Sequence, residues 1–194
     1  MKTKSRISLL VLAAMLVASC STQKAKWANI QFHNTTCHFN VWWNGNESFE
    51  EGVRKLEKVH TDDYTQILPV YKLGTKEQAM TVFPEMDKAI EKGLKGITKH
   101  SIYLQGREYV PYVKKCYLLT AYSTFYKKDY AATTNTCNLI ITQFSGTSTC
   151  DEARILLARN KSMQKMYTDA EADLDKLVTE EAAGNLDRSL NDKL

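Results

Sequence analysis

The sequence lacks the short motifs that mark most catalytic and metal centres. It has no HExxH pair, no GxSxG around a serine and no glycine-rich phosphate loop. Histidines number only four, and His33 and His38 lie beside Cys37 without a further ligand at a suitable spacing. These absences predict a protein that is not an enzyme and that holds no metal and no cofactor.

A membrane-spanning run is also lacking, because the apolar stretch at residues 7–17 is shorter than the roughly 20 residues that a bilayer requires. Positive residues precede this stretch (Lys2, Lys4 and Arg6), and small residues at 17–19 lead to Cys20, as in a secretory signal. Residues 16–20 (LVASC) resemble the lipobox of bacterial lipoproteins. The resemblance implies a signal peptide at 1–19, a diacylglycerol on the Cys20 thiol and a short lipidated tether at 20–31.

No CxxC occurs among the five cysteines, which argues against a zinc site and against a disulfide-framework domain. Apart from Cys20, the cysteines are widely and irregularly spaced: Cys37, Cys116, Cys137 and Cys150. Free buried thiols are the simplest expectation for these four. Because an exported chain permits disulfides, one bridge between Cys116 and Cys137 across a helical hairpin is the alternative.

Net charge is small once the signal is set aside. The full chain carries +4, and three of these charges belong to residues 1–19, so residues 20–194 carry +1. This balance gives no argument for nucleic-acid binding. The apolar fraction of 43% is that of a globular chain with one ordinary domain.

Residues 32–104 are expected to combine an extended segment with helices. Residues 32–46 (FHNTTCHFNVWWNGN) are rich in aromatics, threonine and asparagine, which favours an extended segment ended by the turn-prone residues 44–46. The apolar spacing predicts helices at 47–60 and 85–99. The second helix is expected to bury a stripe formed by Met86, Ile90, Leu94 and Ile97.

A connector at residues 61–74 joins these two helices and is punctuated by Pro69 and Gly74. After it, Thr75 and Gln78 form a capping-box pattern, which predicts the start of a helix.

Residues 105–180 are expected to form paired helices at 112–126, 130–144, 150–166 and 169–179, before a frayed tail at 181–194. A KDY turn ending at Tyr130 and a KMY turn ending at Tyr167 stand 37 residues apart. The spacing from Tyr167 to Ala170 and Leu174 resembles the tetratricopeptide pattern. The predicted fold is therefore all-α: stacked antiparallel helical hairpins, a tetratricopeptide-like solenoid, after the extended aromatic segment.

The aromatic segment is the main candidate for function. Phe39, Trp42 and Trp43 either pack on the helical core or meet a partner, and adjacent side chains of an extended strand would serve both roles. The candidate partner-binding residues are His33, Asn34, Phe39, Asn40, Trp42, Trp43, Asn44, Gly45 and Asn46.

Several motifs together resemble the PorW/SprE lipoproteins. They are the lipobox, HNTT at 33–36, NGNESFEEG at 44–52, HTDDY at 60–64, ILPV at 67–70, MDKAIEK at 86–92 and KHSI at 99–102. That family implies a tetratricopeptide-containing outer-membrane lipoprotein that faces the periplasm and acts as a scaffold in type IX secretion and gliding motility. Family members are usually longer, so the chain is expected to be the amino-terminal part of a family member or a truncated member. Family members also commonly carry a Tyr-Phe type pair where Trp42 and Trp43 stand.

The resemblance implies protein components of a secretion or motility apparatus as partners, with the membrane reached through the Cys20 lipid and with no nucleic acid. The competing interpretation is a helical-repeat lipoprotein that binds a peptide or small ligand. It predicts a deep pocket lined by aromatic residues such as Tyr112, Tyr122 and Tyr126.

Overall fold

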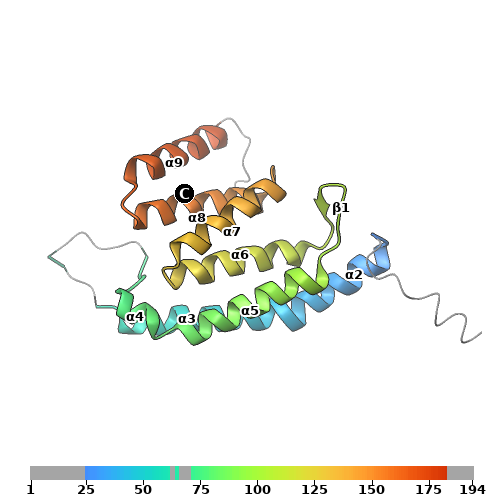
Figure 1. Cartoon of the computed structure of the whole chain (residues 1–194), viewed down its shortest axis with the longest axis horizontal. Helices are drawn as coiled ribbons and strands as arrows, with labels where there is room; N and C mark the ends of the chain where they lie inside the picture. The colour runs from blue at the N-terminus through green and yellow to red at the C-terminus, as the bar shows by residue number, and fades with distance from the viewer. Residues whose placement is uncertain (1–24, 62–63, 66–70, 183–194) are drawn as a thin grey trace, which may run out of the picture.

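The protein folds as an all-α structure, as expected, and the described residues also form one small β-hairpin that was not predicted (Figure 1). The computed structural model describes residues 25–61, 64–65 and 71–182. The predicted signal peptide, Cys20, the first part of the tether and residues 183–194 lie outside the described residues. Among the described helices, none is both long and apolar enough to cross a membrane.

The first layer is one long helical rod. It consists of α2 (Trp27–Thr36), the π-helical segment η1 (Cys37–Trp42) and α3 (Trp43–Val59). The backbone at both junctions is helical, so the three elements form one continuous rod. The predicted extended segment at 32–46 and its turn at 44–46 are therefore wrong.

The physical reason is that the buried residues of this segment recur at helical spacing, although its local composition favours an extended chain. Buried residues recur along the rod every three or four positions, at His33, Cys37, Val41, Gly45, Ser48, Gly52 and Leu56. Packing of this stripe on the rest of the fold overrides the weak helix propensity of threonine, asparagine and the aromatics.

The second layer is α5 (Phe83–His100), which follows the short helix α4 (Lys76–Met80) and lies alongside the rod. The Thr75–Gln78 capping box at the start of α4 is confirmed. On α5 the predicted stripe is partly wrong, because Leu94 is 49% exposed. The residues buried on α5 are Met86, Ala89, Gly93, Gly96 and His100. Gly93 and Gly96 face α6 and let it approach closely.

A tight hairpin, β1 (Tyr103–Leu104) with β2 (Arg107–Glu108), links α5 to the remaining helices. Glu108 is buried behind it, and its carboxylate accepts hydrogen bonds from the Ile102 and Val110 amides at 3.1 and 2.8 Å. These bonds hold the chain where it enters the next helix.

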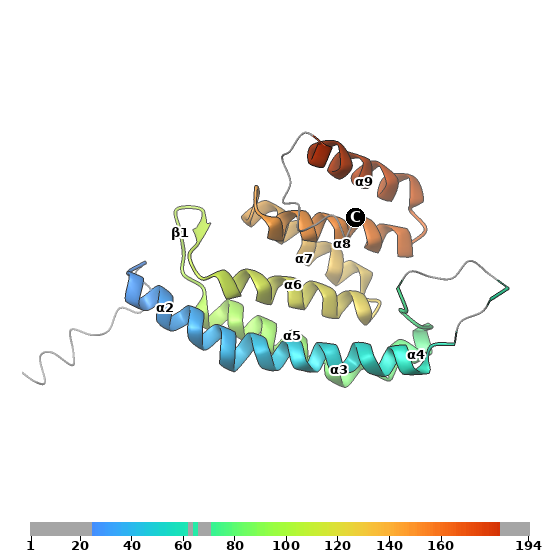
Figure 2. The same ribbon diagram turned by 180° about the vertical axis from the view of Figure 1, so that it is seen from behind.

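Four helices then stack in chain order: α6 (Pro111–Tyr126), α7 (Tyr130–Gln143), α8 (Ser148–Met163) and α9 (Tyr167–Ala182). Their positions confirm the four helices predicted from the sequence. Each packs on the next, and α6 packs on α5, so the layers run from the rod and α5 through α6 and α7–α8 to α9 (Figures 1 and 2).

The two turns that share Lys and Tyr have the same geometry. Lys128 and Lys165 both adopt a positive φ, of 59° and 64°. In each turn the next amide, of Asp129 or Met166, bonds the carbonyl five residues earlier, at 3.0 Å. The 37-residue recurrence is thus a recurrence of backbone structure as well as of sequence.

The core divides into clusters, and the cysteines lie in different ones. Cys116 belongs to the cluster beneath η1 and contacts Cys37, whereas Cys137 packs among α6, α7 and α8. The alternative of a Cys116–Cys137 bridge is therefore wrong, because the two side chains lie in separate clusters.

Candidate functional site

An aromatic groove runs across the helical stack. Three adjoining cavities of about 290, 280 and 560 Å³ form it, and neighbouring cavities share lining residues. Phe49, Tyr122 and Glu152 line both the first and the second cavity. Tyr71 and Arg159 are among the residues that line both the second and the third. The groove thus extends from η1 to α9.

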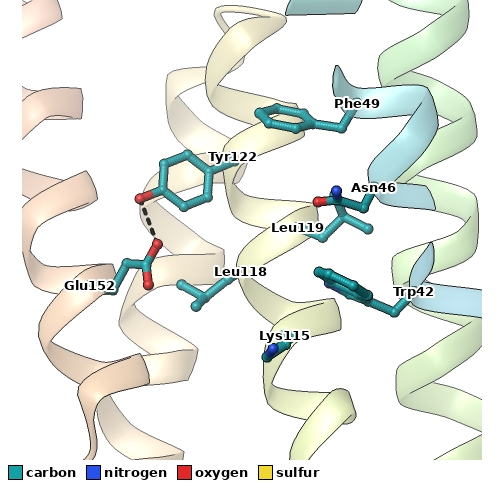
Figure 3. Close-up of a pocket in the computed structure, with 8 residues that line it drawn as sticks. All are labelled: Trp42, Asn46, Phe49, Lys115, Leu118, Leu119, Tyr122 and Glu152. Atoms are coloured by element: carbon teal, nitrogen blue, oxygen red, sulfur yellow. Dashed lines mark hydrogen bonds between the residues drawn. The ribbon is translucent and has the colours of Figure 1, made fainter. Parts of the chain in front are cut away.

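The first end of the groove is built around Trp42, which is half-buried (Figure 3). The Lys115 ammonium lies 5.1 Å from the centroid of the Trp42 ring and 4.7 Å from that of Tyr112. Tyr112 in turn stacks on His38, with their centroids 3.9 Å apart. A cation held over two rings gives this end an apolar wall and a positive rim.

Tyr122 and Glu152 lie on one side of the first cavity, opposite Trp42 and Phe49 (Figure 3). The Tyr122 hydroxyl donates to the Glu152 carboxylate at 3.0 Å. Burial, reinforced by Glu152, raises the pKa of Tyr122 well above its usual range. Tyr122 therefore stays a neutral donor and holds the carboxylate in place at physiological pH.

The middle of the groove is crossed by Arg159 and Tyr71. The Arg159 guanidinium lies 4.2 Å from the centroid of the Tyr71 ring, and it also donates a hydrogen bond to the Tyr71 hydroxyl. Phe49 packs edge-on against Tyr126 at 5.3 Å. These contacts bring α3, α6, α8 and the segment before α4 together around one surface.

The far end lies between α8 and α9 and holds the largest of the three cavities. Tyr167 lines it and is 61% exposed, and Ala170 and Leu174 line it too. Tyr167, Ala170 and Leu174 belong to the predicted repeat pattern together with Tyr130. Tyr130 does not line this cavity, and its carbonyl accepts a hydrogen bond from Asn160 at 3.0 Å. Glu171 and Asp175 make this end acidic.

The nine residues of the predicted partner-binding segment do not lie on one surface. Of its nine residues, Trp42 and Asn46 line the groove. Phe39 and Trp43 are 59% and 52% exposed and line none of the three cavities. A helix turns about 100° per residue, so it distributes neighbouring side chains over different faces.

The other members of that segment make structural contacts. His33 is buried with its Nδ1 3.3 Å from the Nδ1 of His100. Asn34 accepts a hydrogen bond from the Tyr112 amide at 3.2 Å, at the start of α6. Gly45 is buried, while the Asn44 side chain donates to the Asn40 carbonyl along the exposed side of the rod at 3.0 Å.

Sequence reasoning named part of the groove and missed the rest. Tyr122 and Tyr126 line it as the ligand-binding alternative predicted, whereas Tyr112 lies behind Trp42. Arg159 and Tyr71 were not predicted, since no local pattern places a residue of the connector beside α8. Among the described residues, no group of three or more histidine, cysteine or acidic side chains is arranged to hold a metal ion.

Comparison of the chain with the known protein-family models and with curated protein sequences gives no match.

Proposed function

We propose that this protein is a membrane-anchored scaffold of the cell envelope that holds a segment of a partner protein in the aromatic groove. The observation that carries the proposal is the continuity of the three cavities from Trp42 to Leu174. A row of adjoining apolar cavities suits an elongated segment better than a compact ligand. Exposed aromatic and arginine side chains are the residues that most often supply binding energy at protein interfaces.

The charges along the groove specify the partner segment further. Lys115 stands at the first end, while Glu171 and Asp175 stand at the far end. A segment with apolar residues in its middle, an acidic residue near Trp42 and a basic residue near α9 would match this gradient. Charge complementarity would fix the direction in which the segment lies.

The architecture proposed for α6–α9 is tetratricopeptide-like. Its support is the shared geometry of the turns at Lys128 and Lys165, together with Ala170, which is buried where the pattern has a small residue. In the first repeat unit, Thr133 stands where the pattern usually has alanine, and Cys137 stands where it usually has a larger residue. Two repeat units need an additional layer to stack on, and α5 and the rod would serve as that layer.

The cellular setting of the proposal rests on the sequence. The lipobox ending at Cys20 supports an outer-membrane lipoprotein that faces the periplasm. The motifs shared with the PorW/SprE lipoproteins support a role in type IX secretion or gliding motility, with components of that apparatus as partners.

Site-specific photo-crosslinking tests the groove directly. A benzophenone amino acid at Tyr167 would sit inside the groove, and the same group at Leu139 would be exposed on α7 outside the three cavities. In intact cells the proposal expects a discrete partner adduct from position 167 and none from position 139. Equal adducts at both positions, or none at either, would contradict it.

Charge reversal then tests the specificity. Lys115→Glu should weaken the adduct at position 167 several-fold, whereas Lys88→Glu, on the exposed face of α5, should not. Mass spectrometry of the adduct decides whether the partner is a secretion component, and a Cys20→Ala variant shows whether anchoring is needed. Recovery of a bound small molecule from the purified protein by native mass spectrometry would favour the ligand-binding alternative.

A further inference from the structure

Two cysteines far apart in the sequence meet in the core. Cys37 on η1 and Cys116 on α6 are 79 residues apart, and their Sγ atoms lie 3.7 Å from each other. Both side chains are fully buried. Cys137 and Cys150 belong to the α7–α8 region, where the Cys150 thiol contacts the Ile141 carbonyl at 3.9 Å.

The Cys37–Cys116 pair is closely packed on the side of α5. A Cβ at Gly96 of α5 would lie 2.4 Å from the Cys116 Sγ and 3.4 Å from the Cys37 Sγ. Apolar side chains, among them Val113, complete the enclosure. Only a glycine at position 96 allows the two thiols to come together between the rod and α6.

The enclosure also controls when the thiols can react. A hydrogen bond links the two sulfurs. It lowers the pKa of Cys37, whereas the same bond and burial raise the pKa of Cys116. Thiolates are the nucleophiles in thiol–disulfide exchange. Because both thiols are fully buried, an exogenous oxidant is expected to reach them before the rod docks on α6 or during transient opening, and not in the closed structure.

We propose that Cys37 and Cys116 form a disulfide that staples the rod to α6 after export. The thiolate of one cysteine attacks the disulfide of an exogenous oxidant, such as an oxidised dithiol protein, and forms a mixed disulfide while one oxidant thiolate leaves. The second cysteine loses its proton and attacks the mixed disulfide, which releases the second oxidant thiolate. The pair loses two electrons and two protons, and the oxidant disulfide becomes two thiols.

The two sulfur atoms already lie close to each other, at 3.7 Å. An S–S bond measures about 2.05 Å, so the sulfur atoms need to approach by roughly 1.7 Å. The inference does not depend on the groove function. It depends on delivery of the chain to an oxidising compartment, which the signal at residues 1–19 supports.

Peptide mapping of the exported wild-type chain tests the proposal without any variant. Free thiols are blocked by acid quenching and alkylation under denaturing conditions, and the chain is digested with trypsin. Cys37 falls in peptide 27–54, Cys116 in peptide 116–127, and Cys137 and Cys150 together in peptide 129–154. The proposal expects a reducible adduct of peptides 27–54 and 116–127. Full alkylation of both peptides, or a link of either to 129–154, would overturn it.

Thermal unfolding gives a second readout. Closing a loop of about 80 residues should raise the unfolding midpoint on the order of 10 °C, so reductant should lower the midpoint of the wild type by that amount. Reductant should leave the midpoint of Cys37→Ala unchanged, and Cys137→Ala should respond as the wild type does. If Cys37→Ala fails to fold, the wild type and Cys137→Ala still test the proposal. Reductant that lowers the unfolding midpoint of neither protein would overturn it.

Discussion

The Tyr122 hydroxyl donates a hydrogen bond to the Glu152 carboxylate at 3.0 Å, joining α6 to α8 at one wall of the groove. The bond links two helices that are separated in the chain by all of α7. It therefore ties the shape of the groove to the packing of the helical stack.

Replacing Tyr122 with phenylalanine should destabilise the protein by about 1–2 kcal/mol. The ring stays, but Glu152 loses a donor in a partly buried site. Chemical denaturation at pH 7 followed by circular dichroism measures the change. Tyr64→Phe is the matched control, since Tyr64 is 83% exposed, and it should be neutral. Equal stability of the Tyr122 and Tyr64 variants would show that the bond contributes nothing.

Gly93→Ala should destabilise the protein, although alanine is the better helix former. A Cβ at this position would lie 2.3 Å from the Thr120 Oγ1 and 3.0 Å from the Cys116 carbonyl oxygen. Overpacking costs about 1–3 kcal/mol, which exceeds the gain in helix propensity of about 1 kcal/mol. The exposed neighbour Leu94→Ala should change the free energy of unfolding little.

A double variant locates the cause of the Gly93 effect. Adding Thr120→Ala to Gly93→Ala removes the closest atom and should recover part of the lost stability in equilibrium denaturation. Strictly additive effects of the two substitutions would mean that the contact is not responsible.

Asn160→Ala should cost about 2 kcal/mol, because Asn160 is fully buried and binds two groups of α7. Its amide donates to the Tyr130 carbonyl at 3.0 Å and to the Thr134 hydroxyl at 2.8 Å. Asn135→Ala, on the exposed side of α7, provides the control. Hydrogen exchange should show faster opening of the first turn of α7 in the Asn160 variant alone.

Stability should fall as the pH drops below about 6.5. Burial, with smaller contributions from His33 and Lys95, lowers the pKa of His100. An unfolded histidine titrates near 6.5, so the unfolded chain takes up the proton first. The stabilising contribution of neutral His100 is thus present above that pH and is lost as the pH falls towards the lowered value.

Denaturation midpoints measured between pH 7 and pH 5 check this dependence. His100→Gln, which cannot titrate in that range, should make the decline shallower. If stability falls with pH as steeply in His100→Gln as in the wild type, other groups cause the decline.

Local signals in the sequence predicted the second half of the fold well. Clear breaks in the sequence separate the helices of α6–α9, and Thr75 with Gln78 forms a capping box within four residues. Such features depend on contacts between near neighbours, so the sequence displays them directly.

The first part of the rod was mispredicted because the local composition and the tertiary environment of residues 32–46 disagree. Aromatic and threonine side chains around residues 32–46 favour an extended chain, yet buried residues such as Cys37 and Gly45 recur at helical spacing. Packing against α5 and α6 decides between these tendencies. The residues that make these contacts lie far away in the sequence, as for Gly45 with Ala89 and Cys37 with Cys116.

The sequence by itself thus determined that the chain is all-α and where its last four helices lie. It also predicted an export signal at residues 1–19, directly before Cys20. Tertiary structure alone decided that Tyr71 meets Arg159, that Trp42 turns into the groove while Trp43 does not, and that Cys37 contacts Cys116. The physical reason is that periodicity and capping are local properties, whereas a groove and a sulfur pair arise only when distant helices pack together.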